Sequence, residues 1–337
     1  MKKDEITVVF SSDDNYAKYL GVSICSLIKS STKKNNYNII ILDGGISDFN
    51  KDALSKMATD NVNINFYDMS PVVEEYKKRL FVSGHISMAA YYRLFIADVL
   101  KNYEKIIYTD CDVTFVCDIA NLWNEKIRKD DLIAAVPDIG LIYSMDNGKQ
   151  NNEYFLKCIG VEKIEEYFNS GVLIMNLENM RKCDFVNKCI EKLKELKTPV
   201  FHDQDILNAV CVGRVTFLPF KYNYWGNFKY ENPKYKEQFP KQYLEFFEIA
   251  SKDPAIIHYK PWIVPKLEKA YIFWECARET PFYEEILYTN IFDIKYIMRF
   301  SHLKRKIWLY NLLYAVTHNI KFKNKQSRAI AELWRRK

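Results

Sequence analysis

The sequence predicts an α/β protein in which a mixed, mainly parallel sheet is flanked by helices. Short apolar, β-rich runs alternate with helical segments along the first part of the chain, a pattern that is typical of βαβ units. Polar segments follow three of these runs, at Ser11–Tyr16, Asp43–Ile46 and Asp110–Asp112. Because open α/β sheets bind ligands beyond the carboxyl ends of their strands, we expect the functional site where these segments meet.

Each expected element follows from its local sequence. Apolar runs predict strands, whereas longer mixed segments predict helices; Ser47, for example, is placed to cap a helix that begins at Asp48. The expected strands are 6–10, 38–42, 62–67, 105–109 and 132–136, and the expected helices are 15–30, 48–58, 87–100, 183–196 and 205–212. A loop-rich stretch is expected over 219–254.

The composition of the 337-residue chain is that of an ordinary globular protein. Apolar residues make up 48% and charged residues 27%, which excludes a chain that is mainly disordered. The eight cysteines include no C-x-x-C pair of the kind found in many zinc and redox sites. The sequence contains no signal-peptide pattern and no run of about 18 apolar residues that could span a membrane. We therefore expect a cytoplasmic protein with reduced thiols.

Positive charge is concentrated at the end of the chain. Twelve Lys or Arg and two acidic residues give 292–337 a charge of +10, so the rest carries −4 of the net +6. An acidic body argues against a nucleic-acid partner. Apolar residues at steps of three and four, from Tyr296 to Ile320, predict an amphipathic helix with a basic side.

Two interpretations of this helix remain open: it docks on the body, or it contacts an anionic membrane surface. The membrane interpretation predicts a peripheral protein on the inner face of the plasma membrane. We expect one domain over 1–265 and a helical, aromatic and basic extension over 266–337, while 321–337 resembles a polar, partly frayed end.

Two carboxylates, Asp110 and Asp112, follow the expected strand 105–109. Hard oxygen ligands so placed suit Mg²⁺ or Mn²⁺ bound to a diphosphate. Solvated loop acids are one alternative. Another is a phosphatase of the haloacid dehalogenase type, because the D-x-D-x-T string of those enzymes matches the segment that ends at Thr114. A long α/β segment precedes this string, and Asp130-Asp131 precedes a strand instead of following one, so the phosphatase is disfavoured.

Six motifs, in order and in spacing along residues 5–265, resemble those of glycosyltransferase family 8. The bacterial lipopolysaccharide α-galactosyltransferases and α-glucosyltransferases are most similar in pattern. The motifs are Phe10–Tyr16, Leu42–Ser47, His85–Leu94, Phe168–Val172, His202–Asp205 and His258–Trp262. The resemblance implies a GT-A type, Rossmann-like catalytic domain over 1–265, a UDP-sugar donor, Mn²⁺ (or Mg²⁺) and transfer with retention at the anomeric carbon.

The resemblance also assigns the nucleotide end of the site. Tyr16 would stack on the uracil, while Asp13 and Asn15 would hydrogen-bond it, and Ser11 belongs to the same nucleotide-binding segment. Lys260 would pair with the departing diphosphate, as a mobile point charge can.

The metal and sugar ends follow from the other motifs. Asp110, Asp112 and His258 would bind the metal, and Asp110 would also contact the donor. The donor sugar would be held by Arg93, Asn169, Asp203 and Gln204, with Gln204 or Asp203 facing the anomeric carbon. Asp138 matches an acidic residue on the acceptor side. Without its motif, His258 would more often be a packed structural histidine, and Arg93 would more often be a charge on a helix surface. Asp203 and Asp205 could simply be charges at a helix N-terminus.

Two departures from the family pattern affect this assignment. Many members have a Gly-containing insert where Tyr259 here joins Lys260 directly, which removes a main-chain contact to the phosphate. The Asn-Ala-Gly of many members is Asn169-Ser170-Gly171 here, so a hydroxyl is added near the donor sugar.

The sequence thus predicts a retaining hexosyltransferase. The donor is UDP-galactose or UDP-glucose, and the acceptor is an oligosaccharide or a lipid-linked glycan such as lipopolysaccharide. The alternatives are a nucleotide-sugar-binding protein without turnover, the D-x-D-x-T phosphatase, and a glycosidase with paired carboxylates, which needs neither a base-binding set nor a metal.

Overall fold

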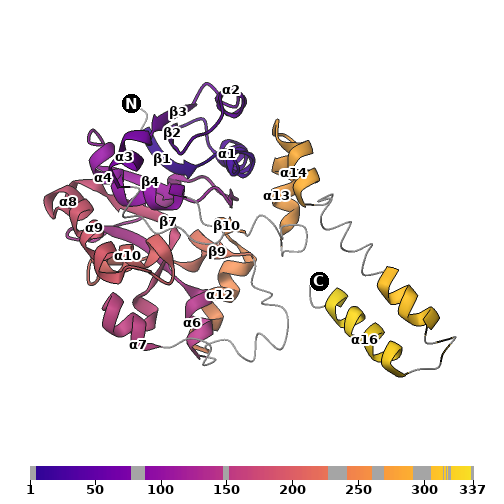
Figure 1. Ribbon diagram of the computed structural model, residues 1–337. Coiled ribbons are helices and arrows are strands. Elements are labelled where there is room, and N and C mark those ends of the chain that lie inside the picture. Colours follow the sequence, from indigo (N-terminus) through magenta and orange to yellow (C-terminus); the bar gives the residue numbers. More distant parts are fainter. Residues whose placement is uncertain are drawn as a thin grey trace. The chain divides into compact units, whose positions relative to one another are not determined.

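The computed structural model describes the chain in several stretches (Figure 1). The described residues are 5–76, 88–146, 152–226, 241–259, 269–290, 305–313, 315, 317 and 320–334. Lys260 and the ends of two motifs, at 85–87 and 260–262, lie outside them. The chain divides into two compact units, Met1–Tyr283 and Glu284–Lys337.

Within the described residues, the first unit is built on a seven-stranded sheet in the order β3-β2-β1-β4-β7-β6-β8. Its strands are β1 (Glu5–Ser12), β2 (Asn36–Asp43), β3 (Val62–Asp68), β4 (Lys105–Thr109), β6 (Ile133–Pro137), β7 (Phe168–Asn176) and β8 (Val215–Phe217). All neighbours pair in parallel except β7, which is antiparallel to both β4 and β6. The mainly parallel sheet predicted from the sequence is confirmed.

The strands inside this sheet are apolar because both of their faces are covered. Every residue of β1 after Glu5 is buried, and so is every residue of β2 after Asn36, as expected for parallel strands packed between helices. The edge strand β3 instead alternates between buried or half-buried and exposed residues along most of its length. The order of the strands therefore agrees with their sequence patterns.

The helices of the first unit agree in large part with the sequence pattern. Those in the described residues are α1 (Ala17–Ser30), α2 (Asp48–Ser55), α3 (Ser70–Tyr76), α4 (Ile96–Val99), α5 (Ala120–Trp123), α6 (Ile139–Asp146), α7 (Asn152–Tyr154), α8 (Leu177–Lys182), α9 (Phe185–Leu196), α10 (His202–Cys211), α12 (Lys241–Lys252) and α13 (Ala270–Ala277). Ser47 caps α2 by accepting a hydrogen bond from the Asn50 amide, as predicted. Short π- and 3₁₀-turns lie at η2 (Phe155–Ile159) and η3 (Ile164–Glu166).

The helix expected over 87–100 differs from the prediction. It is a 3₁₀-helix, η1 (Met88–Phe95), followed by the short α4. Residues three apart lie above one another in a 3₁₀-helix, and Arg93 Nε accordingly donates to the Ala90 carbonyl at 2.9 Å. This geometry turns the Arg93 side chain inward, where it is buried.

A second, three-stranded sheet among the described residues has the order β5-β10-β9. Its strands are β5 (Val113–Phe115), β9 (Tyr224–Trp225) and β10 (Ile256–His258), and η4 (Phe220–Asn223) leads directly into β9. The turn Asp110–Asp112 joins β4 of the large sheet to β5 of the small one. Because β10 pairs antiparallel with β5, His258 lies opposite Val113 and next to that turn.

The first unit continues beyond the predicted domain end at residue 265. Helix α13 packs against α1, and Lys29 of α1 forms an ion pair of 2.5 Å with Glu279 after α13. Contacts define a compact unit that ends at Tyr283. The catalytic domain predicted to end at residue 265 therefore stays a prediction.

The second unit is helical where it is described. It contains most of α14 (Tyr283–Asn290), a helix over 305–313, and α16 (Ile320–Trp334). Much of the predicted apolar stripe lies outside the described residues. The expected frayed end is instead the regular helix α16, whose Lys, Arg, Gln, Ala, Glu and Leu residues are good helix formers. In the described part of the chain, no helix combines the length and the apolar character needed to cross a membrane.

Candidate active site

A cavity of about 460 Å³ lies at the carboxyl ends of β1 and β4, where the strand pattern predicted a site. Its lining includes Ser11, Asp13, Tyr16, Arg93, Asp110, Asp112, Asp138, Asn169, Asp203, Gln204 and His258. Eleven of the thirteen predicted site residues therefore meet at one cavity; the other two are Asn15 and Lys260.

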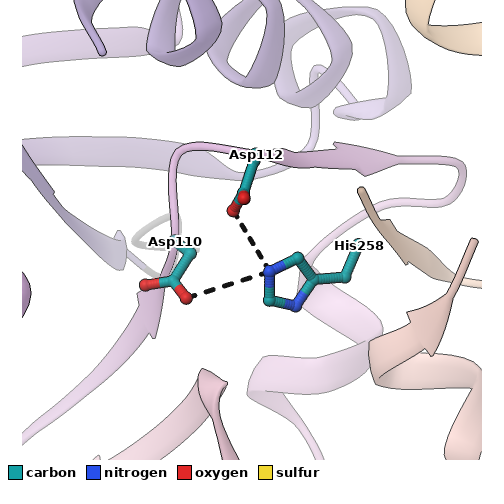
Figure 2. A group of neighbouring side chains, drawn as sticks. All are labelled: Asp110, Asp112 and His258. Atoms are coloured by element: carbon teal, nitrogen blue, oxygen red, sulfur yellow. Dashed lines mark ion pairs between the residues drawn. The ribbon is translucent and has the colours of Figure 1, made fainter. Parts of the chain in front are cut away.

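Asp110, Asp112 and His258 form a compact group (Figure 2). His258 Nε2 lies 3.1 Å from Asp112 Oδ1 and 3.9 Å from Asp110 Oδ2. One potential ligand atom from each residue lies within 4.8 Å of the other two, and the described residues contain no other such group of three His, Cys, Asp or Glu. Two carboxylate oxygens and one imidazole nitrogen form a donor set that suits Mn²⁺.

The backbone explains why these three side chains meet. The Tyr259 amide donates to the Asp112 carbonyl at 2.8 Å, next to the antiparallel pairing of β10 with β5. The Asp110 amide donates to the carbonyl of Gly171 in β7 at 2.9 Å. Hydrogen bonds from both sheets therefore fix the D-x-D turn and the histidine.

Gly171 leaves the space that His258 occupies. A Cβ atom at this position would lie 2.3 Å from His258 Cε1, 2.8 Å from His258 Nδ1 and 2.9 Å from Asp110 Oδ2. Any side chain at residue 171 would consequently displace one of the candidate ligands.

The carboxylates keep His258 basic. Burial alone lowers the pKa of a histidine, but the charges of Asp112 and Asp110, with a hydrogen bond to Asp112, outweigh it and raise the pKa of His258. The same negative field that favours the imidazolium proton would favour a divalent cation in its place.

Arg93 is the buried cation of the site. Its Nη2 lies 2.7 Å from Asp110 Oδ1 and its Nε lies 3.0 Å from Asp203 Oδ2. Its Nη1 donates to the Ser170 carbonyl at 2.6 Å, and its guanidinium carbon lies 4.5 Å from the centre of the Tyr108 ring. Burial opposes the charge, yet Asp110 and Asp203 hold the pKa of Arg93 far above the range in which it could lose its proton.

Asp203 is buried next to Arg93. Burial raises the pKa of Asp203 to about 6, although the charge of Arg93 lowers it in part. The Ser170 hydroxyl lies 3.3 Å from Asp203 Oδ2 and also accepts from Arg93 Nη1 at 3.2 Å. The hydroxyl that departs from the family pattern is therefore engaged by protein groups.

Amide side chains connect the other residues that were predicted to hold the sugars. Gln204 Oε1 accepts from the Ser170 amide at 3.0 Å, and Gln204 Nε2 donates to Asp138 Oδ2 at 2.9 Å. Asn169 Nδ2 lies 3.4 Å from the same Asp138 oxygen. Asp138, predicted on the acceptor side, is thus held by both amides and by the Leu141 backbone amide at 2.9 Å.

The predicted nucleotide end is only partly assembled. Asp13 Oδ1 accepts from the Tyr16 amide at 3.1 Å, and both residues line the cavity with Ser11. Asn15 is exposed and does not belong to the cavity lining. Lys260 lies outside the described residues, so its assignment to the diphosphate stays a prediction.

Two alternative roles can be compared with the structure. Asp205, considered as a helix-terminus charge, is fully buried and accepts from the Tyr167 hydroxyl at 2.6 Å and the Tyr154 hydroxyl at 2.7 Å. Asp131, which a phosphatase would need at the D-x-D-x-T string, pairs with Arg128 at 2.7 Å and does not line the cavity.

Sequence reasoning missed Asn223. Asn223 Oδ1 lies 3.0 Å from His258 Nδ1, and its Nδ2 donates to Asn169 Oδ1 at 2.8 Å. The residue lies in the stretch that was expected to be loop-rich, and its local sequence carries no motif. The pairing of β9 with β10, together with the packing of η4 on β10 and β7, brings it to the site.

Known proteins with similar sequences are glycosyltransferases and related proteins. A sequence model of glycosyl transferase family 8 matches residues 7–264. General stress protein A of Bacillus subtilis is 34% identical over 273 residues, which cover 78% of this chain and 89% of that protein. A lipopolysaccharide 1,2-glucosyltransferase of Escherichia coli is 28% identical over 275 residues, covering 77% of this chain and 74% of that protein.

Solved structures with the same architecture include two glycosyltransferases. The apo structure of the bifunctional glycosyltransferase WbbM has a TM-score of 0.75 and 28% identity over 86% of this chain, which spans only 52% of WbbM. The galactosyltransferase LgtC in complex with donor and acceptor sugar analogs has a TM-score of 0.64 and 25% identity, over 82% of this chain and 96% of LgtC. The predicted GT-A fold is confirmed, and the chain belongs to glycosyl transferase family 8, whose members transfer glycosyl groups.

Proposed function

We propose that this glycosyltransferase moves galactose or glucose from UDP to a hydroxyl of a glycan acceptor, with retention at the anomeric carbon. The observation that carries the proposal is the Asp110/Asp112/His258 group at the edge of a cavity that also contains the Arg93–Asp203 pair. Similar proteins named as lipopolysaccharide glucosyltransferases and a galactosyltransferase support a hexose donor and a cell-surface glycan acceptor.

The three candidate ligands fit a divalent cation, and we propose Mn²⁺ (or Mg²⁺). Their atoms are close enough to share one ion, and Gly171 keeps the adjacent volume free of a side chain. A cation held there would offset the negative charge that develops on the departing diphosphate.

The buried cation and its partners orient the donor sugar in this proposal. Arg93 is held by two carboxylates and a carbonyl, so we expect its position to change little when substrate binds. Asp203 and Gln204 line the same cavity and can accept or donate hydrogen bonds to hydroxyl groups. Fixed groups of this kind stabilise a transition state without reorganising.

The same contacts favour attack from the side of the leaving group. Gln204 is an uncharged amide that already donates to Asp138, and Asp203 is paired with Arg93. Neither is an activated nucleophile, so we propose an ion-pair-like transition state without a covalent intermediate.

A donor panel tests this function. UDP-, GDP- and ADP-hexoses are incubated with the enzyme and Mn²⁺, and then with EDTA, and nucleotide release is measured. The proposal expects metal-dependent release of UDP from UDP-galactose or UDP-glucose alone. Asp110→Asn should lower this rate by at least about 10²-fold, whereas Asp130→Asn, an exposed change outside the cavity, should leave it unchanged.

Other outcomes identify the alternatives. Tight binding of UDP with Mn²⁺ but no turnover on any donor or glycan acceptor would indicate a nucleotide-sugar-binding protein. Hydrolysis of phosphomonoesters without UDP binding would indicate the phosphatase.

We also propose that the C-terminal unit contacts an anionic membrane surface and places the enzyme peripherally on the inner face of the plasma membrane. Trp308, Leu309 and Leu312 of the helix over 305–313 are exposed, at 66%, 44% and 46%. Arg305 and Lys306 of the same helix are also exposed. Apolar and basic side chains together are typical of helices that bind anionic lipid.

A further inference from the structure

Asn223 is held beside His258 by the backbone. It ends η4 and immediately precedes β9, which pairs in parallel with β10 so that Trp225 lies opposite His258. The Gly226 amide also donates to the His258 carbonyl at 3.0 Å. Asn223 is only 6% exposed, so its amide must find its partners inside the protein.

The neighbours of Asn223 determine which way its amide faces. Asn169 Oδ1 accepts from the Gly171 backbone amide at 3.0 Å, which identifies that atom as an oxygen. The Asn223 atom that lies 2.8 Å from this oxygen must therefore be the donor, Nδ2. Its other end, Oδ1, consequently faces His258 Nδ1 at 3.0 Å.

An amide oxygen only accepts hydrogen bonds, so His258 Nδ1 must carry the proton. In the neutral imidazole this leaves the lone pair on Nε2, the atom that faces Asp112 and Asp110. We infer that Asn223 is a positioning residue that selects the Nδ1–H tautomer of His258 and thereby directs Nε2 toward the cation. The inference rests on the proposed metal-dependent function only for its second half, the effect on the cation.

Residue 223 must both accept from His258 Nδ1 and donate to Asn169 Oδ1, so substitutions can remove one or both of these hydrogen bonds. Asp in its place could still accept from His258 Nδ1 but could not donate to Asn169 Oδ1. Leu, of similar size, could do neither. Outer partners of a metal-bound histidine typically change metal affinity by about 10- to 100-fold when they are removed.

The tautomer is measured first, without metal or substrate. Long-range ¹H–¹⁵N correlations of the histidine rings distinguish protonated from unprotonated ring nitrogens, and a His258→Asn spectrum assigns the signals. The carboxylates raise the pKa of His258, so the spectra are recorded at a pH where titration shows that the ring is neutral. The wild type should then show Nδ1–H, and so should Asn223→Asp, whereas Asn223→Leu should lose this preference. A wild-type His258 that carries its proton on Nε2 would overturn the inference.

Cation affinity is measured next, as Mn²⁺ binding followed by electron paramagnetic resonance. Asn223→Leu should bind Mn²⁺ about 10- to 100-fold more weakly than wild type, and Asn223→Asp should retain most of the affinity. The matched control is Asn179→Leu, which removes a half-buried amide that binds the Lys129 and Asp131 carbonyls away from the cavity; it should leave Mn²⁺ binding unchanged.

The outcomes separate this inference from the proposed function. Unchanged Mn²⁺ affinity in Asn223→Leu would overturn the positioning role even if the enzyme is metal-dependent. A wild type that has the Nδ1–H tautomer but binds no Mn²⁺ would contradict the metal-dependent function, while the selection of the tautomer would stand. Thermal unfolding identifies a variant that is not folded, and the wild-type and Asn223→Asp spectra then still decide.

Discussion

Replacement of Gly171 by Ala tests the geometry of the candidate metal site with a single methyl group. The new Cβ would lie 2.3 Å from His258 Cε1 and 2.9 Å from Asp110 Oδ2, whereas ordinary contacts to a Cβ begin at 3.4 Å. The imidazole would have to move by about 1 Å, since Gly171 belongs to β7, which is hydrogen-bonded to strands on both sides.

A shift of this size is large for catalysis and modest for folding. Displacement of a reacting or binding group by about 1 Å can cost about 10²-fold in rate, which corresponds to about 2.7 kcal/mol of transition-state stabilisation. Overpacking a well-packed position lowers the free energy of unfolding by about 1–3 kcal/mol. We therefore expect a folded Gly171→Ala variant that has lost most of its cation binding and its kcat/KM.

The assay combines Mn²⁺ titration, donor turnover and thermal unfolding. Gly213→Ala is the matched control, because Gly213 has a φ of 73° and a Cβ there would meet nothing within 4 Å. It should cost about 1 kcal/mol or more of stability through backbone strain but leave Mn²⁺ affinity unaltered. If Gly171→Ala binds Mn²⁺ as tightly as wild type, the close approach of His258 to β7 is wrong as an account of the site.

Three further changes test other parts of the reasoning. Arg93→Lys should lower kcat/KM by at least about 10²-fold, because one ammonium cannot replace the separate bonds to two carboxylates and the Ser170 carbonyl; a loss smaller than tenfold would argue against a fixed guanidinium. Asp203 has a pKa raised from 3.8 to about 6, so its contribution to stability is greatest below its unfolded pKa of 3.8 and is lost as the pH rises through about 6. Conversely, kcat/KM, which needs the ionised form, should fall as the pH drops below about 6. Asp203→Asn should lack this acidic limb, and an unchanged limb would assign it to another group. The double variant Arg305→Gln, Lys306→Gln should bind anionic vesicles with roughly 30-fold lower affinity than wild type in a sedimentation assay, at about 1 kcal/mol per charge. Equal affinity of the variant and the wild type would contradict the membrane proposal.

The strands β1, β2, β3, β4 and β6 could be predicted because their signal is local. Continuous apolar runs followed by polar residues identify β1, β2 and β4 and also mark the ends at which the cavity lies. The direction of β7 could not be predicted, because its buried apolar sequence resembles that of the parallel strands in the sheet. The 3₁₀ geometry of η1 was also missed, because the periodicity of the segment predicted an α-helix. The contacts of Arg93 with Ser170 and Asp110 join residues that are distant in sequence.

In the candidate site, too, some residues could be predicted from local sequence and others could not. Ordered motifs indicated the residues that line the cavity, but they did not distinguish the inward Asp13 from the exposed Asn15, because both belong to one short turn. Asn223 has no motif at all, and its role follows from the register of β9 against β10. Sequence therefore identified most of the residues that line the cavity, whereas tertiary pairing revealed Asn223, which contacts one of them.

The turn Asp110–Asp112 passes from one sheet to another, and His258 reaches it from a strand more than a hundred residues later in the sequence. A contact of such long sequence separation is entropically costly in the unfolded chain, because a long loop must be closed to form it. During synthesis, the early part of the protein exposes its two carboxylates without the imidazole that completes the group. Cation binding by all three side chains would therefore report that the first unit has reached its native topology, and would make the completed chain harder to unfold.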